Sequence, residues 1–290
     1  MIFPDVTDIL PSINILRVFE PALYRFSKRF FGGRTHSECF EKVRALNQCK
    51  RKAVINFLGE HLRNPEEVRE TVAEYIRLLR GIARHGLDAS ISVKLTQIGL
   101  DINPDLCESN LETICNEARI RNVDVEIDME DSYYTERTIG IVTKLAAKYQ
   151  LRIALQANLM RSQKDIERLI TRKVRIRLCK GAYEEPPRIS YTTPFEINLN
   201  YLFLAFKLLQ ESSFPALATH DIDLIRVINR RFRIIHQSFE FQMLYGVRPD
   251  LQRKLVEKGY TLRVYIPYGS QWLAYGIRRW KKAARMFFGR

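Results

Sequence analysis

Residues 123–156 read VDVEIDMEDSYYTERTIGIVTKLAAKYQLRIALQ, and this stretch decides the fold. Its two ends, Val123–Met129 and Leu151–Gln156, are short apolar runs of the kind that form buried parallel strands. The segment between them, Thr135–Tyr149, has the pattern of an amphipathic helix. A strand, a helix and a second strand in this order predict one βαβ unit of a parallel sheet.

The same unit recurs on both sides of this stretch. Further strands are predicted at Ala53–Leu58, Ala89–Leu95, Val174–Cys179, Ala216–Thr219, Ile235–Phe241 and Leu262–Ile266. Further helices are predicted at Glu66–Arg84, Pro104–Arg119, Ser162–Thr171, Ile197–Gln210, Asp221–Asn229, Pro249–Glu257 and Gln271–Phe287. Eight such units, about 30 residues apart, predict an α/β fold of the (β/α)8 TIM-like barrel class. A doubly wound sheet does not need eight units, and no GxGxxG turn follows the first strand. We expect an N-terminal helical segment over residues 1–50 and the barrel over residues 51–290.

Composition narrows the class of protein. The five cysteines form no CxxC pair and no Cys/His cluster with zinc spacing, so we expect reduced thiols and no metal site. The segment Met1–Leu16 has no basic leader and reads poorly as a secretory signal. No apolar run approaches the length that is needed to span a bilayer.

The formal charge of +14 indicates an anionic partner. Basic residues mixed with Phe, Trp and Met gather near both ends, over 17–34 and over 278–290, which is typical of helices that lie at a lipid interface. Packing of these aromatic residues on the body of the protein is an equal alternative. A nucleic-acid-binding barrel is a rival interpretation, although no recognised nucleic-acid motif is present.

Polar residues follow nearly every predicted strand at its carboxyl end, where barrel enzymes place their sites. They are Glu60, Lys94, Asp128 with Glu130 and Asp131, Gln156, Arg177 with Lys180, Thr219-His220-Asp221, Glu240 with Gln242, and Tyr265. A barrel with only a structural role does not need this coincidence. We therefore predict a polar binding site at this end.

Two groups of cations suggest that the ligand is an anion. Lys94 and Asp128 follow neighbouring strands and could pair, either to bind a carboxylate or as a salt bridge that closes the barrel. The doublet Arg278-Arg279, one turn after Tyr275, could grip a carboxylate or form a solvated basic face.

Seven motifs, in this order along the chain, resemble those of proline dehydrogenase of the single-function bacterial type. They are SVKLTQIG (92–99), IDME (127–130), LQA (155–157), RLCKGAYEEP (177–186), ATHD (218–221), FEFQMLYG (239–246), and YIPYG (265–269) continuing through YGIRR (275–279). The resemblance extends from about Ala53 to Arg279.

This resemblance implies a distorted (β/α)8 barrel that binds FAD. It implies oxidation of L-proline to Δ1-pyrroline-5-carboxylate by hydride transfer from C5 to N5 of the flavin, with electrons passed to a membrane quinone. The excess positive charge, together with a quinone acceptor in the bilayer, leads us to expect a cytoplasmic protein that is peripheral on the inner face of the cell membrane, with an anionic lipid surface as its partner. Nucleic acid is then not an expected partner.

The resemblance also assigns roles to residues. The carboxylate of proline is expected at Lys94, Arg278 and Arg279, with Asp128 supporting Lys94. The pyrrolidine ring is expected against Leu244, Tyr265 and Tyr275, and Arg177 beside the flavin N5. The rest of FAD is expected at Met129, Gln156, Lys180, Gly181, Ala182, Tyr183, Thr219 and His220.

Some positions bear on alternatives and departures. The bulky Tyr265 favours proline over hydroxyproline, because relatives that oxidise hydroxyproline carry a smaller residue there. His220 is expected to bind or hydrogen-bond rather than to act as a general base. Relatives tend to have Lys and Asp where Pro194 and Asn198 stand, near the adenosine end of FAD, and some carry an acidic residue at Lys282.

Overall fold

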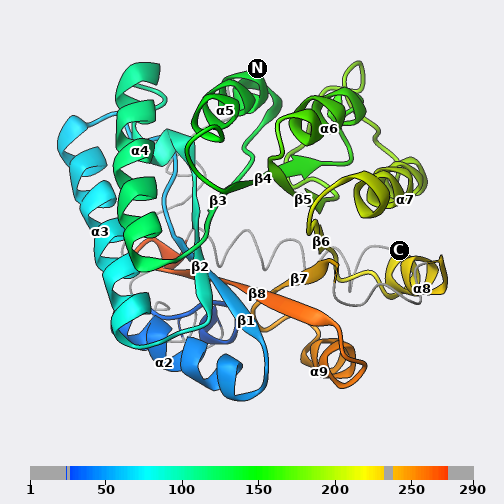
Figure 1. Ribbon diagram of the computed structural model, residues 1–290, viewed down its shortest axis with the longest axis horizontal. Coiled ribbons are helices and arrows are strands. Elements are labelled where there is room, and N and C mark those ends of the chain that lie inside the picture. Colours follow the sequence, from blue (N-terminus) through cyan, green and yellow to red (C-terminus); the bar gives the residue numbers. More distant parts are fainter. Residues whose placement is uncertain (1–23, 25–26, 232–237, 274–290) are drawn as a thin grey trace, which may run out of the picture.

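A computed structural model describes residue 24 and residues 27–231 and 238–273. The strands are β1 (Lys52–Phe57), β2 (Ala89–Val93), β3 (Val125–Ile127), β4 (Leu151–Gln156), β5 (Arg175–Cys179), β6 (Ala216–Ala218), β7 (Glu240–Leu244) and β8 (Thr261–Tyr268). They pair in sequence order, all parallel, and β8 pairs with β1 to close the barrel (Figure 1). The predicted fold class is confirmed.

The helices lie outside the barrel, as Figure 1 shows. Those between the strands are α3 (Pro65–Arg84), α4 (Pro104–Arg121), α5 (Ser132–Leu145), α6 (Ser162–Thr171), α7 (Pro194–Glu211), α8 (Ile222–Arg231) and α9 (Pro249–Glu257). A short 3₁₀ helix, η3 (Leu95–Ile98), follows β2. The predicted eighth barrel helix, Gln271–Phe287, lies outside the described residues from position 274 onward.

Local sequence explains where the helices begin. The Asn64 side chain accepts a hydrogen bond from the Glu66 N–H, and Pro65 occupies the first helical position of α3. At α7 a capping box pairs Thr193 with Glu196 in both directions. Each helix turns an apolar face inward; on α3 that face includes Tyr75, Leu78 and Leu79.

A further helix, α2 (His36–Gln48), precedes the barrel, with the 3₁₀ turn η2 (Lys28–Phe30) before it. The Phe40 and Val43 side chains of α2 are buried in the main hydrophobic core. The predicted division into an N-terminal segment and a barrel stays a prediction, because residues 1–23 and 25–26 lie outside the described part. No described helix is both long enough and apolar enough to cross a membrane.

One predicted strand was misplaced. The predicted seventh strand, Ile235–Phe241, shares only Glu240 and Phe241 with β7, which covers Glu240–Leu244; residues 235–237 lie outside the described part. The reason is that β7 alternates polar Glu240 and Gln242 with apolar Phe241 and Met243, so no continuous apolar run marks where it begins and ends. Glu240 is therefore the first residue of β7 and is buried in the barrel. The prediction that it stands at the carboxyl end of the strand was wrong.

Candidate active site at the carboxyl ends of the strands

Asp128, directly after β3, is the centre of the polar groups at this end of the barrel. Its carboxylate accepts hydrogen bonds from Ser92 Oγ at 2.6 Å and from the Tyr265 hydroxyl at 2.6 Å. It also forms an ion pair with Arg177, and Lys94 Nζ lies 3.8 Å from Oδ2. The predicted pairing of Lys94 with Asp128 is thus confirmed, and Arg177 and Tyr265 join it.

These groups keep one another charged. Burial alone would raise the pKa of Asp128, but Arg177 and Lys94 outweigh it and lower that pKa below its usual value. Burial likewise opposes the charge on Lys94 and on Arg177, yet the facing Asp128 raises the pKa of both. The mouth of the barrel therefore presents fixed cations to a ligand.

A second set of charges lies below Asp128, inside the barrel. Arg177 NH1 donates to Glu126 Oε2 at 3.1 Å. Arg152 NH1 bridges Glu126 Oε1 at 2.9 Å and Glu240 Oε1 at 2.7 Å, and Arg263 Nε lies 2.9 Å from Glu240 Oε1. The side chains of all these residues are at least nine-tenths buried. Barrel interiors are usually filled by Val, Ile and Leu, so this interior is unusually ionic.

A loop suited to an extended anionic cofactor follows β4 and β5. Gln156 Oε1 accepts a hydrogen bond from the Ala182 N–H at 3.2 Å, and Gln156 Nε2 donates to the Glu130 carbonyl at 3.0 Å. Gly181 has a φ of +123°, and a Cβ at this position would overlap the Asn158 side chain. Asn158 Oδ1 is buried without a partner among the described residues. A glycine at the turn, a buried acceptor without a partner and the neighbouring Lys180 fit the polar parts of FAD.

The other predicted cofactor residues are placed around the same end. Lys180, after β5, forms an ion pair with Asp221 at 2.8 Å. The Thr219 hydroxyl, after β6, accepts from the Asp221 N–H, and His220 Nε2 accepts from the Leu244 N–H at 2.8 Å. His220 is thus held by a backbone hydrogen bond, and the expectation that it is not a general base stays a prediction. Met129 is buried after β3, and burial raises the pKa of Tyr183 to about 12.

Two of the predicted substrate-wall residues are described, at the ends of β7 and β8. Leu244 N–H and Tyr265 OH are both engaged in the hydrogen bonds given above, so both residues are held in place. Tyr275, Arg278 and Arg279 lie outside the described residues. The roles assigned to all these residues stay predictions.

The rim next to Lys94 carries a further cluster. Atoms of Glu60, His61 and Glu130 that could bind a metal lie within 4.8 Å of one another. Both Glu130 oxygens already accept hydrogen bonds from Thr96, from its N–H at 3.1 Å and its hydroxyl at 2.6 Å. The expectation of no metal stays a prediction.

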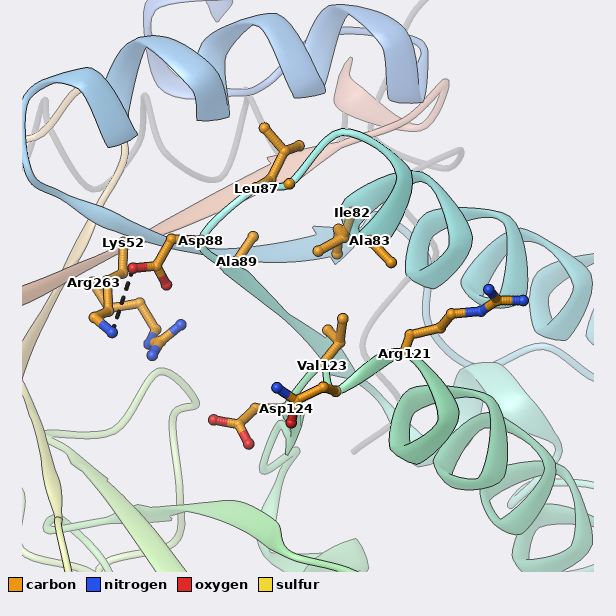
Figure 2. Close-up of a pocket in the computed structure, with 12 residues that line it drawn as sticks. Lys52, Ile82, Ala83, Leu87, Asp88, Ala89, Arg121, Val123, Asp124 and Arg263 are labelled. Carbon is orange, nitrogen blue, oxygen red and sulfur yellow. Dashed lines mark ion pairs between the residues drawn. The ribbon is translucent and has the colours of Figure 1, made fainter.

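The opposite end of the barrel holds a cavity of about 460 Å³, drawn in Figure 2. Lys52 at the start of β1 and Asp88 before β2 form an ion pair of 3.4 Å at its edge, and Arg263 also lines it. This cavity lies at the amino ends of the strands, whereas barrel enzymes place their active sites at the carboxyl ends. We therefore place the candidate site at the Asp128 end.

Sequence reasoning missed part of this constellation. Glu126, Arg152 and Arg263 were counted only as members of apolar strands. The sequence did hold a signal for them. In VDVEIDM an acidic residue occupies every second position, and in LRIALQ a single arginine interrupts a strand that is otherwise mostly apolar. In this barrel, Glu126 and Arg152 face the interior, where they form ion pairs.

Comparisons with known proteins identify the family of this chain. A family model described as "Proline dehydrogenase" matches residues 39–282. Proline dehydrogenase 1 of Bacillus subtilis subsp. natto is 36% identical over 257 residues, covering 87% of this chain and 85% of that protein. Proline dehydrogenase of Deinococcus radiodurans is 32% identical over 267 residues, covering 89% and 86%.

A solved structure shares the fold. The crystal structure of proline utilization A from Bdellovibrio bacteriovorus, inactivated by N-propargylglycine, aligns with a TM-score of 0.84 at 23% identity. The match covers 92% of this chain and 33% of that one, so the chain spans about a third of the longer protein. That likeness concerns the fold, and the family model and the relatives, whose matches cover most of both sequences, lead to one conclusion: the chain belongs to the proline dehydrogenase family.

Proposed function

We propose that this protein oxidises L-proline to Δ1-pyrroline-5-carboxylate, with FAD as its cofactor. The observation that carries the proposal is the Lys94–Asp128–Arg177 cluster, in which Lys94 follows β2, Asp128 follows β3 and Arg177 lies on β5. Lys94 stands beside Asp128 as a second cation of the cluster, next to Arg177, and Glu130 and Glu60 are its other carboxyl neighbours. A mouth of this kind suits an amino-acid carboxylate.

Each residue has a distinct task in this proposal. Lys94 binds the proline carboxylate together with Arg278 and Arg279, and Asp128 holds the Lys94 ammonium in place. Tyr265 packs against the pyrrolidine ring, and its hydrogen bond to Asp128 fixes the orientation of its own ring. A fixed, bulky tyrosine supports proline rather than hydroxyproline as the substrate. Orientation of the donor carbon is the main requirement of hydride transfer.

The cofactor would be held by the loop after β5 and its neighbours. Gly181 and Ala182 form the turn, Gln156 is hydrogen-bonded to Ala182, Lys180 offers a cation, and Met129 is buried after β3. Thr219, His220 and Tyr183 complete the expected set. When bound, FAD would accept the hydride from C5 of proline.

We further propose that the electron acceptor is a quinone, and that the protein lies on the inner face of the cell membrane. The basic residues over 278–290 lie outside the described part, as do Arg17 and Arg25, whereas Lys28, Arg29 and Arg34 are described and exposed. Support within it comes from α7, where Phe195, Leu199 and Phe203 stand at positions i, i+4 and i+8 with 76%, 60% and 51% of their surfaces exposed. The neighbouring helix α8 carries exposed Arg226, Arg230 and Arg231. An apolar stripe beside arginines fits an anionic bilayer.

The central experiment is a visible spectrum of the purified protein before and after addition of L-proline without oxygen. We expect flavin bands that bleach with proline. The Arg278→Ala/Arg279→Ala variant should bleach far less at the same proline concentration, since the carboxylate loses two of its three cations. Arg226→Ala/Arg230→Ala, which removes two arginines from exposed α8, is the matched control and should bleach like the wild type.

Two results would overturn the proposal. Flavin that stays oxidised with L-proline would leave a flavin barrel with another substrate. A protein that takes up no FAD after reconstitution, and purifies instead with excess absorbance near 260 nm, would favour the nucleic-acid-binding alternative.

A further inference from the structure

The arginine nearest the candidate site is held from two sides. Arg177 NH2 pairs with Asp128 above it, and Arg177 NH1 donates to Glu126 Oε2 at 3.1 Å below it. Its guanidinium is 5.5 Å from the centre of the Tyr265 ring. A guanidinium whose two terminal nitrogens are engaged by separate carboxylates has little freedom to rotate.

The two carboxylates differ in what else they serve. Asp128 is shared with Lys94, Ser92 and Tyr265 at the mouth. Glu126 lies one layer deeper, where it accepts from Arg152 NH1 at 2.9 Å and from Gln242 Nε2 at 3.1 and 3.2 Å. Within the described residues, the contacts that link Glu126 to the Asp128 cluster are its hydrogen bond from Arg177 and its hydrogen bonds from Gln242, which itself accepts from Arg177.

We propose that Glu126 is a positioning residue: it fixes the orientation of Arg177 and offsets part of the Arg177 charge, and thereby sets how strongly the site attracts electrons to a bound flavin. The inference rests on the proposed function, in which Arg177 lies beside the flavin. A fixed charge in a buried, low-dielectric site acts strongly on the charge that develops on a ligand. Removal of the Glu126 charge leaves Arg177 less neutralised, so the site should favour added electrons.

The barrel supplies a matched control. Glu240 is as deeply buried as Glu126 and accepts from the same Arg152 and Gln242, at 2.7 and 2.8 Å. Within residues 27–231 and 238–273, no hydrogen bond or ion pair joins Glu240 to Arg177. Glu240→Gln therefore removes a similar charge from the same interior without releasing Arg177.

The test is the two-electron midpoint potential of the bound flavin, measured by anaerobic dye-linked reduction without proline. For Glu126→Gln we expect a more positive potential, with at least a tenfold larger ratio of reduced to oxidised flavin at a given applied potential. That ratio corresponds to about 30 mV for a two-electron couple. Glu240→Gln should shift the potential much less. Glu126→Asp keeps the charge but withdraws it from Arg177, and should fall between Glu126→Gln and the wild type.

Equal shifts in Glu126→Gln and Glu240→Gln, or no shift in either, would overturn the inference. If Glu126→Gln does not fold, Glu126→Asp against Glu240→Gln decides it by the same comparison. Failure of the proposed function shows itself separately, as wild-type protein that binds no flavin or is not bleached by proline.

Discussion

Gly181 is the residue at which backbone conformation and the proposed cofactor loop are most closely linked. With φ at +123° and the Asn158 amide where a Cβ would stand, Gly181→Ala forces a shift of this loop. A non-glycine residue held in such a conformation costs about 1–3 kcal/mol. We expect lower affinity for FAD, by about tenfold or more, measured by fluorescence titration of apoprotein. Gly140→Ala in α5, where a Cβ meets nothing within 4 Å, should bind FAD normally and gain about 0.5–1 kcal/mol. Equal FAD affinity in the two variants would contradict the expectation.

Glu130 gives a prediction about pH. Burial raises the pKa of its carboxyl above 4.5, against the opposing effects of Lys94, Thr96 and His61. A carboxyl whose folded pKa is raised contributes stability that is complete below the unfolded pKa and is lost as pH rises through the folded pKa. Glu130→Gln has no such loss and can keep both hydrogen bonds with Thr96.

The measurement is urea unfolding of both apoproteins at pH 5 and pH 8. The unfolding free energy of Glu130→Gln minus that of the wild type should be more positive at pH 8 than at pH 5. Glu67→Gln, on the exposed face of α3, controls for the removal of one carboxylate. A difference for Glu130→Gln that does not change between the two pH values would show that Glu130 does not release its proton in this range.

Among the elements, α7 is the one whose outer face is unlike that of a solvated helix. Its stripe of Phe195, Leu199 and Phe203 includes no charged residue, and this makes it a candidate for lipid contact. We expect Phe195→Ser/Leu199→Ser/Phe203→Ser to lower binding to anionic vesicles at low salt by at least about tenfold, a change of 1.4 kcal/mol. Co-sedimentation measures it. Ile120→Ser on α4, where the side chain is 70% exposed, is the matched control and should bind as the wild type does.

The other possible occupant of this face is a second copy of the chain. A stable interface buries about 800 Å² per partner, more than three side chains of one helix provide, so we favour lipid. Unchanged vesicle binding in the triple variant, with a shift from dimer to monomer in size-exclusion chromatography with light scattering, would reverse that choice.

At the level of elements, the sequence predicts most of what the structure contains. Apolar strands at regular intervals located β1 to β6 and β8, because fully buried strands are continuous apolar runs and the helices between them are capped by recognisable residues such as Asn64-Pro65. It failed at β7, where Glu240 and Gln242 face a polar interior and break the run. The contacts of Lys94 with Asp128 followed from neighbouring strand ends, whereas the Arg152–Glu240 contact links residues 88 apart and depends on closure of the barrel.

The interior of the whole barrel contains buried arginine–carboxylate ion pairs as well as apolar side chains, and these pairs affect its stability. Arg152 is shared by Glu126 and Glu240, which burial keeps from water. Arg152→Met leaves both carboxylates short of a partner, and breaking a buried ion pair costs about 3–5 kcal/mol. Urea unfolding of the apoprotein should show this loss. Arg226→Ala, which breaks an exposed pair with Asp223, should cost less than about 1 kcal/mol.

The double variant Arg152→Met/Glu240→Gln tests whether charge balance is the cause. It restores two arginines, Arg177 and Arg263, against two carboxylates, Asp128 and Glu126. If the interior is stabilised as a balanced set, the double variant should be more stable than Arg152→Met alone, although it has lost one more native side chain. If the two changes simply add, the arginine acts through packing, and the ionic interior does not decide how stably the barrel closes.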